Sequence, residues 1–479
     1  MATQYETVIG LEVHVELATK TKIFCACSTA FGGEPNSRTC PVCTGMPGSL
    51  PVLNKKVLEH AVAVGLATNC TINRYCKFDR KNYFYPDNPQ NYQISQLYLP
   101  ICRNGYVEID AAGRPSGKKR IGIHEIHMEE DAGKLIHDEN EGCTLVDYNR
   151  SGVPLIEIVS EPDMRDAEEV IAYLDKLRLI IRYLGASDCK LQEGSMRVDV
   201  NLSVRPVGEE KLGIRTEMKN LGSFRAISRA VEAEKNRQTA LLESGRTVIR
   251  ETRRWDEAGD VSYSMRSKED IQDYRYFPDP DLAPVSVTDA WLEEIRARQP
   301  ELRTEKMARY RTEYHIPEYD IGIITESKPM ADLFEAAVAL GVPPKKVSNW
   351  LMGETLRLLK ERGLDFGDIC ISPVHLAKLI EMTDGRVINS TVAKEVFEVM
   401  FDKDVDPERY VEEHGLKMVG DADTLRRAVE EVIAANPESV QDYRNGKDRA
   451  IGFLVGRTMK AMKGKADPVS VNRLLRELL

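Results

Sequence analysis

Residues 9–17 read Ile-Gly-Leu-Glu-Val-His-Val-Glu-Leu, so apolar side chains occupy every second position. This alternation is typical of a β-strand with one buried face, and it places Glu12, His14 and Glu16 together on the other face. Side chains two residues apart on a strand are separated by about 6.5–7 Å, so convergent Glu12 and His14 side chains could share one cation. The alternative is a polar face that contacts only solvent.

Two later segments, residues 197–205 and 214–219, alternate in the same way. Their polar positions are Arg197, Asp199, Asn201, Ser203, Arg205, Arg215, Glu217 and Lys219. Polar faces on several strands indicate a lined cleft. A metal–nucleotide complex requires cations beside carboxylates, because the cations contact phosphate and the carboxylates contact Mg²⁺. We therefore assign ATP binding to Arg197, Asp199, Arg215, Glu217 and Lys219.

A further carboxylate, Glu157, interrupts the apolar run of residues 155–159. An ionised carboxylate is costly there unless it is paired or bound to a metal. A buried structural ion pair is the alternative explanation. Residues 127–131 read His-Met-Glu-Glu-Asp and end at Ala132-Gly133, a pattern that on its own is more typical of a solvated turn than of a ligand set.

Four of the ten cysteines form two close pairs, Cys25 with Cys27 and Cys40 with Cys43, with twelve residues between the pairs. Such spacing is typical of a tetrahedral four-thiolate zinc site. A closed thiolate shell leaves no open coordination position, so we expect structural rather than catalytic zinc. The alternative is four buried thiols without a metal.

Several known catalytic motifs are absent from the sequence. It contains neither the GxxxxGK[ST] phosphate loop nor the GxGxxG dinucleotide fingerprint, so we expect any ATP to lie on a sheet. It also lacks a Ser-Lys amidase arrangement and a glutaminase cysteine in a recognisable setting. If the reaction uses ammonia, another protein produces it.

The composition is that of a soluble protein of several domains. The chain has 479 residues, of which 42% are hydrophobic and 30% charged. Because no long apolar segment and no apolar leader are present, we expect a cytoplasmic location. The formal net charge of −10 argues against nucleic-acid binding over the whole surface, although it leaves room for local basic patches.

The patterning predicts an α+β protein with three domains. Short β-rich runs continue to a proline-stiffened stretch at residues 276–284, and helical spacing follows. We therefore expect a mixed-sheet cradle domain at residues 1–290, a helical domain at 291–404 and a small helical tail domain at 405–479.

The tail combines positive charge with a helical pattern. Seven basic residues face one acid, Asp448, which gives a local charge of +6; they are Arg444, Lys447, Arg449, Arg457, Lys460, Lys463 and Lys465. An apolar stripe at helical spacing consists of Ile451, Leu454, Val455, Thr458, Met459 and Met462. Gly452 and Gly456 would allow another helix to approach. We expect contacts with RNA phosphates, and the alternative is a solvated basic helix.

Together, several of these segments resemble the B-type subunits of tRNA-dependent amidotransferases. The resemblance lies in residues 8–17, in Phe-Asp-Arg-Lys-Asn-Tyr-Phe-Tyr-Pro-Asp at 78–87 and in His-Met-Glu-Glu-Asp-Ala-Gly-Lys at 127–134. It continues, in the same order, in Leu-Ile-Glu-Ile-Val-Ser-Glu-Pro at 155–162, Asp-Tyr-Arg-Tyr-Phe-Pro at 273–278 and Ile-Gly-Phe-Leu-Val-Gly at 451–456. It covers essentially the whole chain.

The resemblance implies a heterotrimeric ligase. In that family, the A-type subunit hydrolyses glutamine, the small C-type subunit binds the other two, and the B-type subunit phosphorylates the side chain of Asp-tRNA(Asn) or Glu-tRNA(Gln) before ammonia displaces phosphate. The resemblance also implies a mixed-sheet cradle, a helical domain and a tRNA-contacting tail.

The same resemblance maps a catalytic Mg²⁺ onto His14, Glu130 and Glu157, with Glu12 close by, and a catalytic lysine onto Lys81. We add Tyr83, an aromatic neighbour of Lys81, to the catalytic residues. Because all four cysteines are present, the family's structural zinc is carried over as well.

Two other functions fit parts of the sequence. A non-catalytic zinc-bearing scaffold that binds tRNA would explain the cysteines and the basic tail but not the charged strand faces. A self-sufficient glutamine amidotransferase would need the glutaminase residues that are missing.

Overall fold

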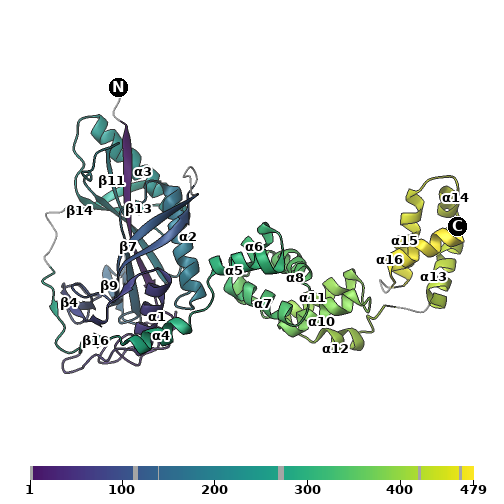
Figure 1. The fold of residues 1–479 in the computed structure, drawn as a ribbon, viewed down its shortest axis with the longest axis horizontal. Helices are drawn as coiled ribbons and strands as arrows, with labels where there is room; N and C mark the ends of the chain where they lie inside the picture. The colour runs from purple at the N-terminus through teal and green to yellow at the C-terminus, as the bar shows by residue number, and fades with distance from the viewer. Residues whose placement is uncertain (1–3, 112–116, 139, 268–273, 419–421, 463–465) are drawn as a thin grey trace. The chain divides into compact units, whose positions relative to one another are not determined.

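The computed structural model describes residues 4–111, 117–138, 140–267, 274–418, 422–462 and 466–479. The chain divides into two compact units, Met1–Leu302 and Arg303–Leu479. A mixed sheet in the first unit and helices in the second confirm the predicted α+β class (Figure 1). Lys463 and Lys465, which the sequence analysis included in the basic tail, lie outside the described residues.

The first unit is built on a nine-stranded sheet with the order β14-β13-β12-β11-β1-β10-β7-β6-β2. Its strands are β1 (Tyr5–Glu16), β2 (Thr71–Ile72), β6 (Cys102–Asp110), β7 (Lys118–Glu130), β10 (Pro154–Ser160), β11 (Met196–Pro206), β12 (Thr216–Lys219), β13 (Glu251–Asp256) and β14 (Val261–Ser267). Only β12 and β13 pair in parallel within the described sheet. The first strand of the chain therefore lies in the middle of the sheet, between β10 and β11.

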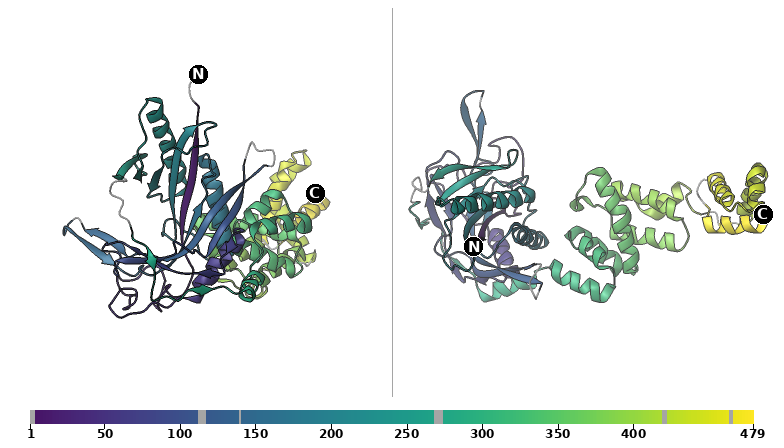
Figure 2. Two further views of the ribbon diagram at one scale, coloured as in Figure 1. Left: turned by 60° about the vertical axis from the view of Figure 1, so that its left-hand side comes forward. Right: turned by 90° about the horizontal axis from the view of Figure 1, so that it is seen from above.

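Smaller strand sets surround this sheet. They are β15 (Phe277–Pro278) with β4 (Asp79–Asn82) and β5 (Tyr92–Ser95), β16 (Val285–Ser286) with β3 (Tyr75–Cys76), and β8 (Lys134–Asp138) with β9 (Cys143–Asp147). The β8–β9 pair is drawn in Figure 2 as a hairpin that extends from the unit.

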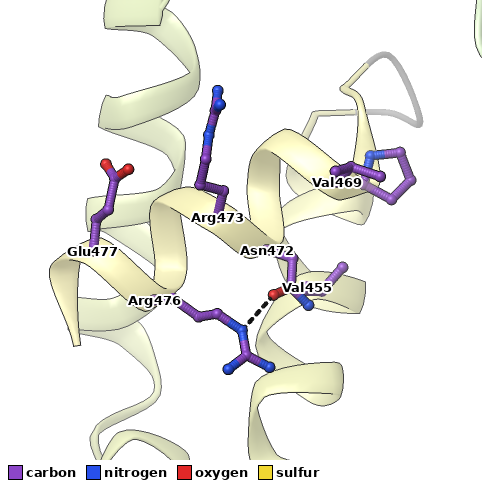
Figure 3. Close-up of a pocket in the computed structure, with 7 residues that line it drawn as sticks. Val455, Val469, Asn472, Arg473, Arg476 and Glu477 are labelled. Carbon is purple, nitrogen blue, oxygen red and sulfur yellow. Dashed lines mark hydrogen bonds between the residues drawn. The ribbon is translucent and has the colours of Figure 1, made fainter.

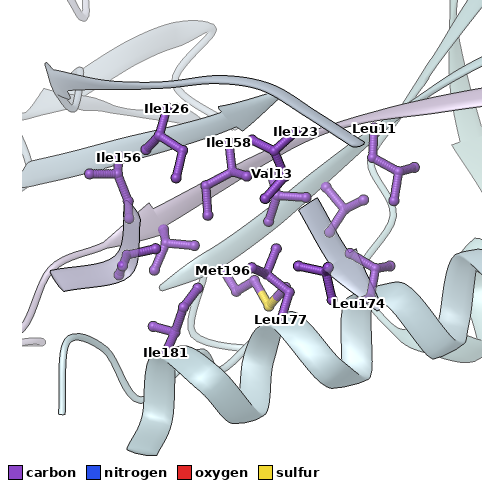
Figure 4. Packing of buried hydrophobic residues seen from close by; sticks show 14 of the residues in the cluster. Leu11, Val13, Ile123, Ile126, Ile156, Ile158, Leu174, Leu177, Ile181 and Met196 are labelled. Atoms are coloured by element: carbon purple, nitrogen blue, oxygen red, sulfur yellow. The ribbon is translucent and has the colours of Figure 1, made fainter. Parts of the chain in front are cut away.

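Helices cover one face of the large sheet. They are α1 (Lys55–Ala67), α2 (Ala167–Tyr183) and α3 (Phe224–Glu243). Figure 4 shows Leu174, Leu177 and Ile181 of α2 against apolar residues of the strands, including Val13 and Met196. The apolar positions of β1 are thus buried beneath helices, and its polar positions lie on the opposite face.

The helix boundaries agree with local capping chemistry. Asp166 and Ser223 precede α2 and α3, and their side chains accept hydrogen bonds from the first-turn N–H groups of Glu169 and Ala226. The first unit also includes α4 (Asp289–Ala297), which packs on α1 and extends past the predicted boundary at residue 290. The predicted domain ranges stay predictions.

The second unit is helical. It contains α5 (Arg303–Arg309), η2 (Tyr310–Tyr314), α6 (Glu318–Ile324), α7 (Lys328–Ala339), α8 (Pro344–Trp350), η3 (Leu351–Thr355), α9 (Leu356–Arg362), η4 (Phe366–Asp368), α10 (Pro373–Asp384), α11 (Ser390–Lys403) and α12 (Pro407–Glu413). It ends with α13 (Ala422–Ala435), α14 (Pro437–Arg444), α15 (Arg449–Ala461) and α16 (Pro468–Leu478). One apolar cluster spans residues 310–411 and another spans residues 425–475. No helix within the described residues combines the length and apolarity needed to cross a membrane.

Candidate functional site

A row of ionisable side chains crosses four neighbouring strands of the large sheet. The strand register pairs His127 of β7 with Glu157 of β10, Glu157 with His14 of β1, and His14 with Arg197 of β11. Because directly paired residues on antiparallel strands project from the same face, their side chains converge. The strand predicted at residues 9–17 thus places His14 beside Glu157, which is distant in sequence but adjacent in the sheet.

His14, Glu129 and Glu157 form a compact group in which one ligand atom of each lies within 4.8 Å of the others. The Nε2 atom of His14 is 3.4 Å from Oε2 of Glu157 and 3.7 Å from Oε1 of Glu129. On the other side, Nε2 of His127 is 3.0 Å from the same Glu157 oxygen. One nitrogen and two carboxylates at this separation are a donor set that fits a single divalent cation.

These groups shift one another's proton affinities. Burial alone would lower the pKa of His14, but hydrogen bonding to Glu157 and its charge raise that pKa above its ordinary value. The pKa of His127 is likewise raised by Glu157 despite burial. Burial would raise the pKa of Glu157, yet the two histidines hold it well below its ordinary range. The two histidines therefore stabilise the ionised form of the Glu157 carboxylate.

Glu130 does not join this group, although the sequence analysis assigned it a ligand role. Its Oε1 atom accepts hydrogen bonds from the Ile94 backbone N–H at 3.0 Å and from Nε2 of Gln90 at 2.5 Å. Burial is the main reason that the pKa of Glu130 rises to about 8. Because successive residues of a strand point to opposite faces, Glu129 rather than Glu130 shares the face of His127.

A second carboxylate group lies on the same face. Glu12, Asp199 and Glu217 each offer an oxygen within 4.8 Å of the others. Lys219 contacts Asp199 and, at 2.9 Å, Glu217. Nδ2 of Asn201 donates to Glu12 at 2.9 Å. Burial is the main reason that the pKa of Glu12 is raised, and the charge of Glu157 raises it further. Glu12 therefore interacts electrostatically with the His14–Glu129–Glu157 group as well as with its own.

The two predicted arginines occupy different surroundings. Arg197 forms an ion pair with Asp131 at 3.0 Å, whereas Arg215 is exposed just before β12. Glu16, the third polar residue of residues 9–17, lies near Asp131, and burial and the charge of Asp131 raise its pKa to about 7.

Lys81 and Tyr83 lie on or beside β4, next to tyrosines that the sequence analysis did not single out. The ammonium of Lys81 is 5.0 Å from the ring centre of Tyr274, and the ring of Tyr83 contacts the same ring edge to face at 6.2 Å. The ring of Tyr276 contacts that of Tyr274 edge to face at 6.3 Å, and burial, followed by the charge of Glu129, raises the pKa of Tyr276. Tyr274 and Tyr276 lie in the motif at residues 273–278, and the spacing of that motif does not indicate a role for them.

The four predicted cysteines come together. One sulfur of each lies within 4.8 Å of the others, and the Sγ atoms of Cys40 and Cys43 are 3.9 Å apart. In tetrahedral zinc–thiolate sites a Zn–S distance of about 2.3 Å places the sulfurs about 3.8 Å apart. A hydrogen bond from Cys25 is the main reason that the pKa of Cys43 falls to about 4, and the Cys40 backbone N–H and the charge of Lys22 lower it further. Cys25, Cys27, Cys40 and Cys43 thus fit a four-coordinate metal ion.

The basic tail segment is largely solvent-exposed in its described part. Arg444, Lys447, Arg449, Arg457 and Lys460 are exposed, and Lys447 pairs with Asp442 at 2.9 Å. Ile451, Leu454 and Thr458 are buried, and Gly452 and Gly456 face open space. Between α15 and α16 lies an open cavity of about 580 Å³, lined by Val455, Val469, Arg473 and Arg476 among others (Figure 3).

Comparison with known proteins adds an independent result. Residues 7–293 match the family described as GatB/GatE catalytic domain, and residues 332–479 match the GatB domain family. Three relatives are each named as the B-type subunit of aspartyl/glutamyl-tRNA(Asn/Gln) amidotransferase. They come from Agathobacter rectalis (70% identical), Lachnoclostridium phytofermentans (66%) and Caldicellulosiruptor saccharolyticus (58%), and each alignment covers 99% of both chains. The resemblance noted in the sequence is confirmed: this chain belongs to the family of B-type subunits of aspartyl/glutamyl-tRNA amidotransferases.

Proposed function

We propose that this chain uses ATP to phosphorylate the side-chain carboxylate of Asp-tRNA(Asn), Glu-tRNA(Gln) or both, and that ammonia then displaces phosphate to give the amide. A carboxylate is a poor acyl donor because its leaving group would be oxide or hydroxide. Phosphorylation supplies a leaving group. The observation that carries the proposal is the row of His127, Glu157, His14 and Arg197 across one sheet face, beside a second carboxylate group.

We propose that His14, Glu129 and Glu157 hold one Mg²⁺. When bound, Mg²⁺ offsets the negative charge that accumulates on a transferring phosphoryl group. His127 contacts Glu157 at 3.0 Å and so orients the carboxylate from outside the ligand set. The sequence-based assignment of Glu130 stays a prediction, and it requires that side chain to leave Gln90 and Ile94.

The second group suits the nucleotide. Glu12, Asp199 and Glu217 would hold the cation that accompanies ATP, while Lys219 and Arg197 supply positive charge for its phosphates. Arg215, exposed just before β12, can extend to the same phosphates. Ion pairs with Asp199 and Glu217 keep the ammonium of Lys219 beside these carboxylates.

Lys81 would neutralise the carboxylate or the phosphate as charge develops on it. The Tyr274 ring lies under its ammonium, and Tyr83 contacts that ring, so the aromatic side chains fix where the charge lies. A positioned cation is more effective than a mobile one because its reorganisation is complete before reaction.

The proposal requires partners. Ammonia would come from a glutaminase of the A type, with the small C-type protein completing the complex, and the tail segment would contact the tRNA backbone. Zinc bound by the four cysteines would be structural, and the reaction would take place in the cytoplasm.

Transamidation assays test the proposal. Purified chain together with its A-type and C-type partners should amidate misacylated tRNA, and ATP hydrolysis should require that tRNA. ATP hydrolysis that is absent with Asp-tRNA and Glu-tRNA alike, in a complex that still binds tRNA, would instead indicate the non-catalytic scaffold. Comparing the two tRNAs identifies the substrate.

A further inference from the structure

Lys22 is a buried lysine without a carboxylate partner. Its side chain is 0% exposed, and its Nζ atom lies 3.2 Å from the carbonyl oxygen of Tyr148 and 3.5 Å from Sγ of Cys43. Within the described part of the chain, no carboxylate forms an ion pair with it. A buried ammonium is costly unless an anion or strong acceptors compensate it. The group beside this ammonium that can become an anion is the thiol of Cys43.

A metal-bound four-cysteine site would carry excess negative charge. Four thiolates around Zn²⁺ leave a net charge of about −2, which is unfavourable in an interior of low dielectric constant. Cys43 is the most buried of the four cysteines, and its sulfur also accepts a hydrogen bond from the Cys40 backbone N–H at 3.2 Å. A neutral N–H shields the sulfur only in part, whereas an ammonium also offsets charge.

We propose that Lys22 is the charge-compensating partner of the metal-bound four-cysteine site, and that its hydrogen bond to Cys43 makes the metal–thiolate bonds resistant to electrophiles. This inference rests on the proposed zinc site and is separate from tRNA amidation. A hydrogen bond withdraws electron density from the thiolate sulfur. The sulfur is then less nucleophilic and more slowly lost from the metal.

The local backbone fixes the position of Lys22. The backbone N–H of Lys22 donates to the Cys27 carbonyl at 2.9 Å. This hydrogen bond fixes the Lys22 backbone relative to the Cys25–Cys27 pair. The N–H of the next residue, Ile23, donates to the Gly152 carbonyl at 2.9 Å.

Ser151 and Gly152 pack closely against Lys22 and Cys43. Gly152 has a φ of +80°, and a Cβ there would lie 3.5 Å from both Cys43 Cβ and Lys22 Cδ. The Ser151 hydroxyl donates to the Cys43 carbonyl at 2.9 Å. The lysine stem is therefore enclosed between the cysteine loop and residues 148–152, and its ammonium has little freedom to leave the sulfur.

The test compares Lys22→Met with Lys20→Met in the full chain. Methionine has a similar length but neither charge nor donor, and Lys20 is an exposed lysine in the same loop. After Co²⁺ substitution, the sulfur-to-cobalt charge-transfer bands should move to lower energy in Lys22→Met and stay unchanged in Lys20→Met. Zinc release by N-ethylmaleimide, followed with a metal-sensitive dye, should be about tenfold faster in Lys22→Met only.

A second variant separates charge from hydrogen bonding. Lys22→Gln keeps an N–H donor without the charge, so its bands and release rate should fall between those of wild type and Lys22→Met; it also serves if the methionine variant does not fold. Wild-type bands and release rates in the substituted proteins would overturn the proposal. Wild-type protein without bound metal would also overturn it, whereas failure of amidation alone would affect only the proposed function.

Discussion

Glu129 and Glu130 are adjacent in β7, yet their carboxylates have different partners: Oε1 of Glu129 lies 3.7 Å from Nε2 of His14, whereas Oε1 of Glu130 accepts the Ile94 N–H at 3.0 Å. Strand alternation separates them, because neighbouring residues project from opposite faces. Of the two carboxylates, only that of Glu129 lies beside His14.

The first prediction concerns this pair. Glu129→Gln and Glu157→Gln should each lower phosphorylation of aminoacyl-tRNA about 10²-fold and raise the Mg²⁺ concentration needed, because each removes an anionic ligand. Glu130→Gln is the matched control and should leave the Mg²⁺ requirement near that of wild type. The opposite ranking in a Mg²⁺ titration would restore Glu130 as the ligand and exclude Glu129.

Lys81→Ala should lower amidation strongly while the glutaminase activity of the complex persists, because the lysine charge acts on the phosphoryl or carboxylate group. The control is Lys77→Ala, since Lys77 lies just before the same strand and contacts Tyr98 instead. Parallel measurement of glutamine hydrolysis and amide formation checks the result. If both activities fall together because the complex dissociates, Lys81 has a structural role.

Glu234 should contribute to acid sensitivity. Burial would raise its pKa, but hydrogen bonds from Arg237, Gln238 and Thr216 hold that pKa below its ordinary value. A depressed folded-state pKa stabilises the protein above the unfolded-state value of about 4.3, and this contribution disappears as the pH falls through the folded-state pKa.

Glu234→Gln should therefore destabilise the protein by about 3 kcal/mol at pH 7 and make its stability less dependent on pH below about 4.3. Urea unfolding at pH 7 and at lower pH values measures both effects. Glu243→Gln, at an exposed position near the end of α3, should change neither. If the stability of Glu234→Gln and that of wild type depended on pH in the same way, Glu234 would not contribute to acid sensitivity.

The tail segment should contribute sequence-independent affinity for tRNA. Changing Arg457 and Lys460 to Gln should weaken binding at low salt and reduce the slope of log K against log salt by about 1–2, because each phosphate contact releases counterions. Arg426→Gln is a control, since that exposed arginine pairs with Glu430 at 3.1 Å.

Deletion from about residue 405 onward should flatten the slope further while ATP binding and metal content persist. An unchanged slope in the deletion would locate the tRNA contacts outside the tail.

The sequence predicts much of the fold because alternation in residues 9–17 and 197–205 specifies which face is buried. The cysteine spacing predicts a local cluster because the members of each pair are already close in sequence, so the fold has only to bring the two pairs together. The sequence pattern does not predict that Glu157 lies beside His14, because alternation does not specify which strand pairs with β1. The structure groups Glu129 with His14 and Glu157, whereas the sequence analysis assigned Glu130, and alternation through residues 127–130 is the signal that distinguishes the two. Tyr274 lies beside Lys81 through long-range contacts, the pairing of β15 with β4 and the hydrogen bond from the Asn82 N–H to the Tyr274 carbonyl, which the sequence pattern does not predict.

The central position of β1 has a consequence for biosynthesis. Glu12 pairs with Val159 on one side and with Asp199 on the other, so the first strand leaves the ribosome long before either neighbour exists. Until residue 206 has been translated, its alternating apolar side chains and both of its edges lack their full set of partners within the sheet. The middle of the large sheet can therefore close only after β10 and β11 have both been made, and unpaired strand edges with exposed apolar side chains favour aggregation until then.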